Sequence, residues 1–230
     1  MDYDDVEALA ALGWSRRTVA PKAPLDPAGG LCILASGLVS RHRTAPDGGR
    51  QLLALLLPGD VCDFRFVTGT SQPSRLSAMT EATVMEISAE ALLPLVERRP
   101  RILATLLSHL AEDHAVAEEL LISLGRRTAL ERTAHLLCET HFRLSRMGLV
   151  RDGAFLMTLT QAELGDYLGL SAVHVNRTLQ ELRRRGLVQS AGGRIRILNL
   201  EALQALAGFS PAYLRRPARA GSRPQPRFDA

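Results

Sequence analysis

The segment Leu159–Val188 constrains this chain more than any other, because it fits two short helices joined by a tight turn. Thr160 followed three residues later by Glu163 forms a capping box, which predicts the start of the first helix. Gly169 permits a sharp turn, and Ser171 is a typical N-cap for the second helix. The segment therefore has the features of a helix-turn-helix, whose second helix can enter the DNA major groove.

The second predicted helix has one apolar and one polar face. Val175, Leu179 and Leu182 recur at helical spacing, which predicts that they are buried. The opposite face carries histidine, asparagine, glutamine and arginine side chains, which can bond base edges and phosphates. We therefore expect this helix to be the one that reads DNA.

A basic hairpin is predicted directly after this helix. The helix ends in the run Arg183–Arg185, and the following LVQSAGGRIRILNL alternates like a strand pair around Gly192-Gly193. Helix, turn, helix and hairpin together predict a winged helix, and they weigh against an ordinary solvated helical hairpin. The residues that we expect at the DNA are Thr160, Gln161, Ser171, Ala172, Val173, His174, Asn176, Arg177, Gln180, Arg183, Arg184 and Arg194.

Positive charge is concentrated in the C-terminal half of the chain. Residues 1–125 carry 11 basic and 16 acidic side chains, a net charge of −5. Residues 126–230 carry 17 basic and 8 acidic side chains, a net charge of +9, and the two halves together give +4. A polyanionic partner is therefore expected at the C-terminal end only.

The cysteines and the apolar runs exclude several classes of protein. Cys32, Cys62 and Cys138 lie far apart and have no zinc-binding or CxxC spacing, and their odd number argues against a disulfide framework. The acidic start MDYDDVEALA is not typical of a signal peptide, and no run of 18 apolar residues occurs. We expect a cytoplasmic protein that does not contact a membrane. Without a nucleophile–base motif or a phosphate-binding glycine loop, an enzyme is not expected.

Residues Leu31–Ser88 consist of short apolar runs separated by turn residues. Asp47-Gly48 between two apolar runs is a hairpin signal, and Pro58-Gly59-Asp60 marks another turn. This spacing predicts a small antiparallel barrel or roll.

A long helix is expected from Pro100, a residue favoured at the first helical position, to Gly125. Its apolar stripe either packs against the helix's own domain or joins two protomers in a coiled coil, with Asp113 or His114 as the polar break. A DNA reader with one short recognition helix generally needs a dimer, which favours the second interpretation. The expected interface residues are Leu103, Leu106, Leu107, Leu110, Asp113, His114, Ala117, Leu120, Leu121 and Leu124.

Together these elements predict an α+β fold. An N-terminal antiparallel β-roll, cupin-like or of the jelly-roll type, is followed by a long dimerisation helix and a C-terminal winged helix-turn-helix. The expected bounds are residues 1–99 for the roll, 100–125 for the long helix, 126–209 for the DNA-binding domain and 210–230 for a flexible basic tail.

The chain resembles the Crp/Fnr family of bacterial transcription regulators from about Leu25 to Phe209. The segments that carry the resemblance are LLPGDVCDF, GRRTALERTAHLLCE and LTQAELGDYLGLSAVHVNRTLQELRRRGLV. It implies a homodimer that binds a palindromic operator, contacts RNA polymerase and couples a signal in the roll to the DNA. By the family pattern Arg177 would read guanine. Val173 stands where many relatives have glutamate, which implies contact with a thymine methyl and an altered operator.

The roll departs from the family members that bind cyclic AMP. Those relatives carry a Gly-Glu-Leu stretch and an Arg-Ser-Ala stretch, whose arginine pairs with the cyclic phosphate. Here the first stretch becomes Cys62-Asp63-Phe64, and the second falls near Gln72-Pro73-Ser74, with Arg75 out of register. Because the positive anchor is missing, cyclic AMP is not expected.

Other family cofactors receive little support from the residues. Oxygen-sensing members hold an iron–sulfur cluster through several cysteines, and Cys32 and Cys62 cannot supply four thiolates. Haem bound through His42 or another histidine stays open, as does a redox role for the two cysteines. No cofactor or metal is predicted, and the effector ligand is undetermined.

The alternative function is a protein-interaction module whose winged helix no longer binds DNA. Arg177, the run Arg183–Arg185 and the basic hairpin argue against it, because a protein contact does not need this set of positive charges.

Overall fold

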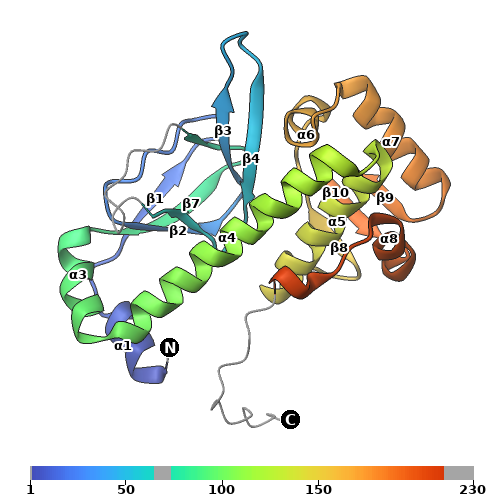
Figure 1. Cartoon of the computed structure of the whole chain (residues 1–230). Coiled ribbons are helices and arrows are strands. Elements are labelled where there is room, and N and C mark those ends of the chain that lie inside the picture. Colours follow the sequence, from blue (N-terminus) through green and yellow to red (C-terminus); the bar gives the residue numbers. More distant parts are fainter. Residues whose placement is uncertain (1, 65–73, 215–230) are drawn as a thin grey trace, which may run out of the picture.

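A computed structural model describes residues 2–64 and 74–214 of the chain (Figure 1). A β-roll lies on one side of a long helix and a mainly helical unit lies near its C-terminal end. The basic tail expected from residue 210 falls outside the described residues from 215 onward, as do Gln72 and Pro73.

Two antiparallel sheets form the roll. Its strands are β1 (Ser15–Val19), β2 (Leu31–Ser36), β3 (Val39–Thr44), β4 (Arg50–Leu56), β5 (Val61–Asp63), β6 (Arg75–Ala78) and β7 (Ala82–Ile87). One sheet has the order β1-β7-β2-β5 and the other β4-β3-β6. Alternate residues face inward, so that Cys32, Leu34, Leu56 and Val84 form a buried core between the sheets.

Two short helices cover one end of the roll. Helix α1 (Tyr3–Ala10) begins with a capping box between Asp2 and Asp5, and α3 (Ala89–Arg98) is capped by Ser88. Apolar side chains from the roll, from α3 and from the start of the long helix share one cluster, which includes Leu31, Leu92 and Ile102. The long helix is thereby attached to the roll from its first turn.

The long helix, α4 (Pro100–Arg126), starts at Pro100 as predicted and runs one residue beyond Gly125. The backbone becomes extended at Arg127, and Thr128 then caps α5 (Ala129–Arg146) in a capping box with Glu131. The break between the two helices is therefore two residues long.

The C-terminal unit combines helices with a small sheet. It contains β8 (Ala154–Leu156), α6 (Gln161–Leu168), α7 (Ala172–Arg184), β9 (Val188–Ala191), β10 (Arg194–Ile197), α8 (Leu200–Ala207) and a 3-10 turn (Pro211–Leu214). The sheet has the order β8-β10-β9, the arrangement of a winged helix. The predicted α+β architecture is thereby confirmed. In the described ranges, no helix is long and apolar enough to cross a membrane.

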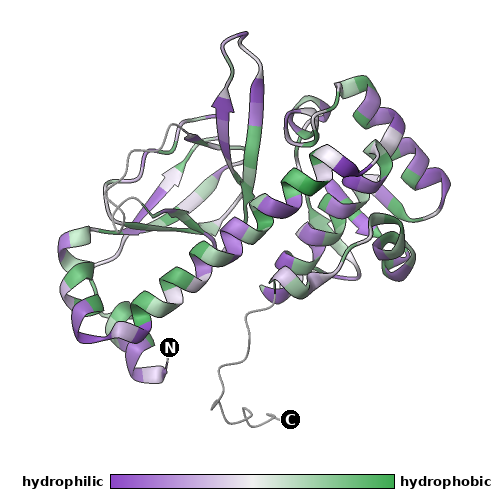
Figure 2. Cartoon of the chain, in the orientation of Figure 1, coloured by the Kyte–Doolittle hydropathy of each residue, from purple (hydrophilic) through white to green (hydrophobic). Residues whose placement is uncertain are grey.

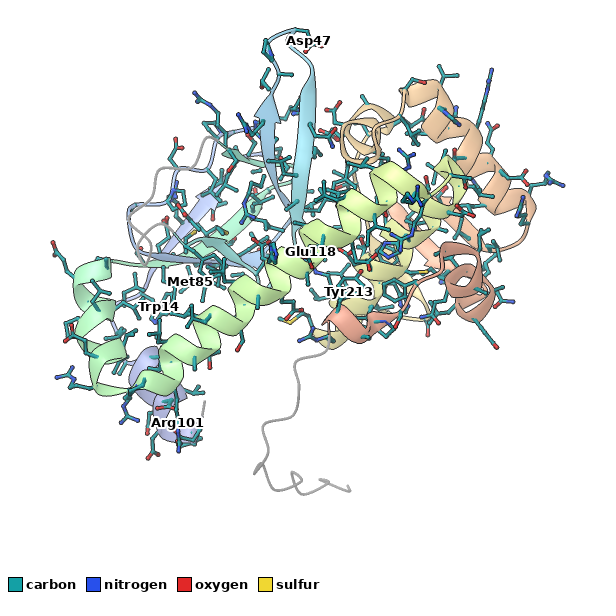
Figure 3. The ribbon with its side chains drawn as sticks, viewed as in Figure 1. Trp14, Asp47, Met85, Arg101, Glu118 and Tyr213 are labelled. Carbon is teal, nitrogen blue, oxygen red and sulfur yellow. The ribbon has the colours of Figure 1, made fainter. Side chains whose placement is uncertain are left out.

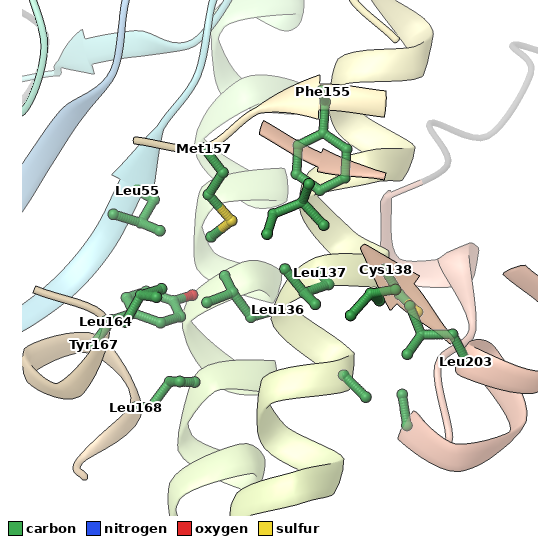
Figure 4. Close-up of a cluster of buried hydrophobic side chains, with 14 of the residues drawn as sticks. Leu55, Leu136, Leu137, Cys138, Phe155, Met157, Leu164, Tyr167, Leu168 and Leu203 are labelled. Atoms are coloured by element: carbon green, nitrogen blue, oxygen red, sulfur yellow. The ribbon is translucent and has the colours of Figure 1, made fainter. Parts of the chain in front are cut away.

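The largest buried cluster in the described residues joins the roll to the C-terminal unit. Figure 4 shows Leu55 of β4 beside Met157, Leu164 and Tyr167, and these residues belong to one continuous apolar core. The two parts of the chain are therefore packed against each other through side chains, and not only connected by α4 and α5.

The 3-10 turn after α8 packs against α4 and α5. Tyr213, labelled in Figure 3, donates a hydrogen bond to the Glu139 carboxylate at 2.7 Å, and Arg146 donates to the Leu214 carbonyl at 2.7 Å. The His135 ring lies edge-on to Phe209, with centroids 5.3 Å apart, and is stacked on Tyr213 at 6.3 Å. His135 is consequently enclosed by three segments of the chain.

We expect this histidine to make the protein less stable in acid. Burial, together with the nearby Arg127, lowers the pKa of His135 from 6.5 to about 4, although Glu119 lies 3.4 Å away. The unfolded chain therefore takes up a proton between pH 6.5 and 4 that the folded chain does not, and the free energy of unfolding falls by up to about 3 kcal/mol across this window. Urea unfolding at several pH values, compared between the wild type and His135→Gln, isolates this contribution. Parallel pH profiles of the two proteins would show that the prediction is wrong.

Candidate nucleic-acid interface

The turn between α6 and α7 has the geometry that the sequence predicts. The Thr160 hydroxyl accepts a hydrogen bond from the Glu163 amide at 3.2 Å, and the Glu163 carboxylate accepts one from the Thr160 amide at 2.8 Å. Gly169 adopts the left-handed conformation with φ of +63°, and the Ser171 hydroxyl caps α7 through the His174 amide at 3.3 Å. The predicted helix-turn-helix is confirmed in each of these features.

Close backbone approach fixes the angle between α6 and α7. A Cβ atom at Gly165 would lie 2.3 Å from the Leu170 carbonyl oxygen, so only glycine allows the chain after the turn to pack against α6. On the other side of this contact, Val175, Leu179 and Leu182 of α7 are buried as predicted. The recognition helix is thus held rigidly on its apolar side.

Gly165→Ala should destabilise the protein by about 1–3 kcal/mol, because the clash is with backbone and can be relieved only by moving α7. Thermal unfolding followed by circular dichroism measures the loss. Gly125→Ala is the matched control, since no atom lies within 4 Å of its added Cβ and alanine favours the helical backbone. A Gly165→Ala protein that is as stable as the control would contradict this description of the turn.

The exposed face of α7 carries most of the predicted base-reading residues (Figure 2 shows hydrophilic colour along this helix). Val173 is 63% exposed, and His174, Arg177 and Gln180 are also exposed, whereas Ala172 and Asn176 are half-buried. Within residues 2–64 and 74–214, no hydrogen bond or ion pair engages the Arg177 guanidinium. Arg177 is therefore available to a partner outside the chain.

The arginines at the end of α7 are engaged differently. Arg184 and Arg185 both pair with the Glu181 carboxylate, at 2.8 and 2.7 Å. Hydrogen bonds from these two arginines lower the pKa of Glu181 to about 2. Arg183 donates to the Leu179 carbonyl at 3.1 Å and stays exposed. Of the predicted contacts on this helix, Arg184 is thus the one that an ion pair within the described residues holds against the protein.

Two surface hollows bring the predicted residues together. Ser171, Val173, His174 and Arg177 line a shallow groove between α7 and the first turn of α5. On the other side of α7, Gln161, Arg183 and Arg194 line a hollow between α6, α7 and the hairpin. Thr160 is exposed at the start of α6, so every segment expected at the DNA lies on the helix-turn-helix or its wing.

The α4 stripe divides into a buried and an exposed part. Leu106 and Leu120 are only 7% and 8% exposed because they pack into the cores of their own protomer. Asp113 accepts a hydrogen bond from Arg41 of the roll at 2.7 Å. The expectation that Leu106 and Leu120 face a partner is therefore corrected, whereas Asp113 is half-buried and its place at the interface stays a prediction.

The remaining seven predicted interface residues are not buried in the protomer. Leu107 and Leu121 are 50% and 70% exposed, His114 and Ala117 are exposed, and Leu103 and Leu124 are half-buried. All seven follow an alternating spacing of four and three residues, which is the spacing of a coiled-coil seam. We call this set the α4 seam; its members are Leu103, Leu107, Leu110, His114, Ala117, Leu121 and Leu124.

The described part of the roll contains few groups that suit a cyclic phosphate. Cys62, Asp63 and Phe64 are buried, with an acidic side chain at Asp63, and Arg75 is exposed at the start of β6. An acidic residue and an outward arginine do not provide the positive anchor that a phosphate needs. Among the described residues, no group of three His, Cys, Asp or Glu side chains is placed to hold a metal ion.

The residues singled out for haem or redox chemistry are all buried. The three cysteines are buried and unpaired by disulfides, and Cys32 and Cys62 face the same core from neighbouring strands. The hydrogen bond with Cys32, together with burial, raises the pKa of the Cys62 thiol, which lowers its reactivity. His42 lies near Arg50 and Asp166, so it is situated at the contact between the roll and α6.

Sequence reasoning missed the arginines that hold the DNA-binding unit in place. Arg127 pairs with Glu119 of α4 at 2.9 Å, and Arg132 donates to the Arg127 carbonyl at 3.1 Å. Arg143 is paired with Glu139 one helical turn before it. Only this last pair has a sequence signal, the i,i+4 spacing of opposite charges.

Comparisons with known proteins agree with this geometry. Residues 23–99 match the family model of the cyclic nucleotide-binding domain, and residues 131–206 match that of the Crp-like helix-turn-helix domain. The fumarate and nitrate reduction regulatory protein of Vibrio cholerae is 29% identical over 180 residues, 78% of this chain and 72% of that protein. The transcriptional activatory protein AadR of Rhodopseudomonas palustris is 27% identical over 210 residues, 90% of this chain and 85% of that protein.

A solved structure shows the same fold over most of the chain. FixK2 of Bradyrhizobium japonicum superposes with a TM-score of 0.74 at 25% identity, covering 86% of this chain and all of that one. A roll joined through a long helix to a winged helix-turn-helix, with regulators as relatives, defines a transcription regulator with a DNA-binding domain. The chain belongs to the Crp/Fnr family. The prediction that it is not an enzyme is confirmed by these relatives.

Proposed function

We propose that this protein acts as a homodimer that reads a palindromic DNA operator with one α7 helix from each protomer. The observation that carries the proposal is the exposed face of α7, on which Arg177 has no hydrogen-bond or ion-pair partner among the described residues, while the opposite face is buried in the core. Arginine can bond guanine through O6 and N7 in the major groove. Val173 supplies an exposed apolar contact that suits a thymine methyl.

The α4 seam supports the homodimer. Its leucines would remain in water in a monomer, and the spacing of four and three residues matches a two-stranded coiled coil. His114, which lies near the middle of the seam and pairs with Glu118 at 3.3 Å, is the polar position that would fix the register. Two readers related by a two-fold axis then require two inverted half-sites about one helical turn apart.

The roll is proposed as the part that responds to a signal. Since the described residues do not fit a cyclic phosphate, we infer that the signal is not cyclic AMP. RNA polymerase is proposed as a further partner, because the relatives include a transcriptional activatory protein. A protein-interaction module without DNA binding is not favoured, because Arg177 and Arg194 are exposed and free to meet phosphate or bases.

Selection of operators from random duplex DNA tests this function. The full-length protein should enrich a palindrome with a guanine at the position of Arg177 and a thymine near Val173. Enrichment should be repeated at two salt concentrations, because non-specific binding weakens steeply with salt. Recovery of DNA without any common palindrome would contradict the proposal.

A further inference from the structure

The β-roll and the C-terminal unit (β8 to the 3-10 turn, with α5), which we call the recognition unit, are joined by a cluster of charged side chains as well as by apolar packing. Arg143 of α5, whose side chain is 13% exposed, reaches the turn between β4 and β5 and pairs there with Asp60. The same guanidinium donates to the Leu55 carbonyl of β4 and to Glu139, both at 3.3 Å. A single side chain thus connects α5 to two successive segments of the roll.

Asp60 is fixed from its own side of the junction. Its carboxylate accepts a hydrogen bond from the Leu57 amide at 2.7 Å, and its carbonyl accepts one from Leu34 of β2 at 3.0 Å. On the far side of Arg143, Glu139 accepts the hydroxyl of Tyr213 at 2.7 Å. Because the Arg143 side chain is largely buried and Asp60 is half-buried, separating the partners would leave the Arg143 charge poorly compensated.

A second, more exposed ion pair repeats this connection at the β3–β4 hairpin, whose tip is marked by Asp47 in Figure 3. Arg50 of β4 pairs with Asp166 of α6 at 2.8 Å, and the Gln51 amide donates to the Tyr167 carbonyl at 3.3 Å. Since α6 packs directly against the recognition helix, the hairpin and the Asp60–Arg143 pair hold the same rigid body at two points.

We propose that the contact between the roll and the recognition unit, centred on the Asp60–Arg143 pair, determines the spacing between half-sites that the protein accepts. The inference rests on the proposed function, because spacing has meaning only for a dimer on two half-sites. The two-residue break at Arg127 and Thr128 would otherwise let each recognition unit turn relative to α4. One base pair of spacing rotates a half-site by about 35° about the DNA axis, so a fixed orientation selects one spacing.

The test measures affinity for operators that differ only in spacing. The selected palindrome is compared with versions that have one base pair more or fewer between the half-sites, at one salt concentration. The wild type should prefer its own spacing by about tenfold or more, comparable to the cost of a wrong base pair. In Asp60→Asn combined with Arg143→Gln, this preference should fall to about threefold or less, while the preferred sequence within each half-site stays unchanged.

Two further variants separate orientation from stability. Arg17→Gln removes an ion pair with Glu86 that lies wholly within the roll, with contacts of 2.8 and 2.9 Å, and should keep the wild-type spacing preference. Arg50→Ala removes the more exposed ion pair with Asp166 at the hairpin, and this variant should fold. It should weaken the spacing preference even where the Asp60→Asn, Arg143→Gln double variant does not fold.

The results distinguish failure of this inference from failure of the proposed function. If selection yields no palindrome, the proposed function is wrong. If a palindrome is selected but the folded junction variants keep the wild-type spacing preference, the inference is wrong and the function stands. The inference is equally overturned if Arg17→Gln reduces the spacing preference as much as the junction variants do.

Discussion

Leu121→Glu should convert the protein to a monomer and lower its affinity for the palindromic operator by about a thousandfold, to the level of non-specific binding. Leu121 is 70% exposed in the protomer, so the substitution does not disturb the protomer's own core. In a parallel two-stranded seam each residue meets its own copy, and two glutamates would then face each other across the two-fold axis. Sedimentation velocity gives the oligomeric state, and titration of labelled operator gives the affinity.

The matched control for this substitution is Leu93→Glu. Leu93 is a 43% exposed leucine on α3, away from the α4 seam, and its replacement introduces the same charge. It should remain dimeric and bind the operator like the wild type. A Leu121→Glu protein that stays dimeric with unchanged operator affinity would show that the seam is not the interface.

Arg177→Ala should cost about 1–3 kcal/mol of binding free energy on the selected operator and far less on random DNA. The guanidinium has no intramolecular partner in the described residues, so its removal subtracts contacts with DNA without exposing a buried charge. Competition titrations with both DNAs at one salt concentration measure the two losses. Equal losses on both would reduce Arg177 to a phosphate contact.

Arg184→Ala is the control on the same helix. Its guanidinium is held by Glu181 through two hydrogen bonds of 2.8 Å, beyond the base-reading turns of α7. It should therefore change specific and random affinity by similar, small amounts. A large loss confined to the operator would mean that Arg184 leaves Glu181 and reads a base.

Local signals were sufficient for the helix-turn-helix. The capping box of Thr160, the left-handed Gly169 and the Ser171 cap each act within four residues of the backbone that they stabilise. Their energetic effect does not depend on the rest of the fold, and the structure contains all three. The same holds for the Gly192-Gly193 turn of the wing, where both glycines have positive φ.

The phase of the long helix could not be read from its sequence. Leucine occurs at positions that fit two registers, one through Leu106 and Leu120 and one through Leu107 and Leu121. The choice depends on which face the roll covers, and this is decided by tertiary packing around Ile102 and Leu106. Sequence periodicity located the apolar stripe but did not show which of its two registers packs against the helix's own protomer.

The ion pair between Asp60 and Arg143, by contrast, had no local sequence signal. Asp60 and Arg143 are 83 positions apart, and each looks like an ordinary turn or helix residue in its own segment. Their pairing requires the β4–β5 turn to meet α5, which depends on the packing of Leu55 against Leu164 and Tyr167. The burial of the Arg143 side chain then gives the pair its importance, because a largely buried charge does not readily exchange its partner for water.

The mass of the protein–DNA complex tests the central claim most directly. Native mass spectrometry on the selected operator should show two chains bound to one intact duplex, and no complex with a single chain. With one half-site scrambled, the two-chain complex should persist only at much higher protein concentration, because half of the specific contacts are lost. Single chains binding each half-site independently, or a stoichiometry that does not depend on the operator sequence, would contradict the account.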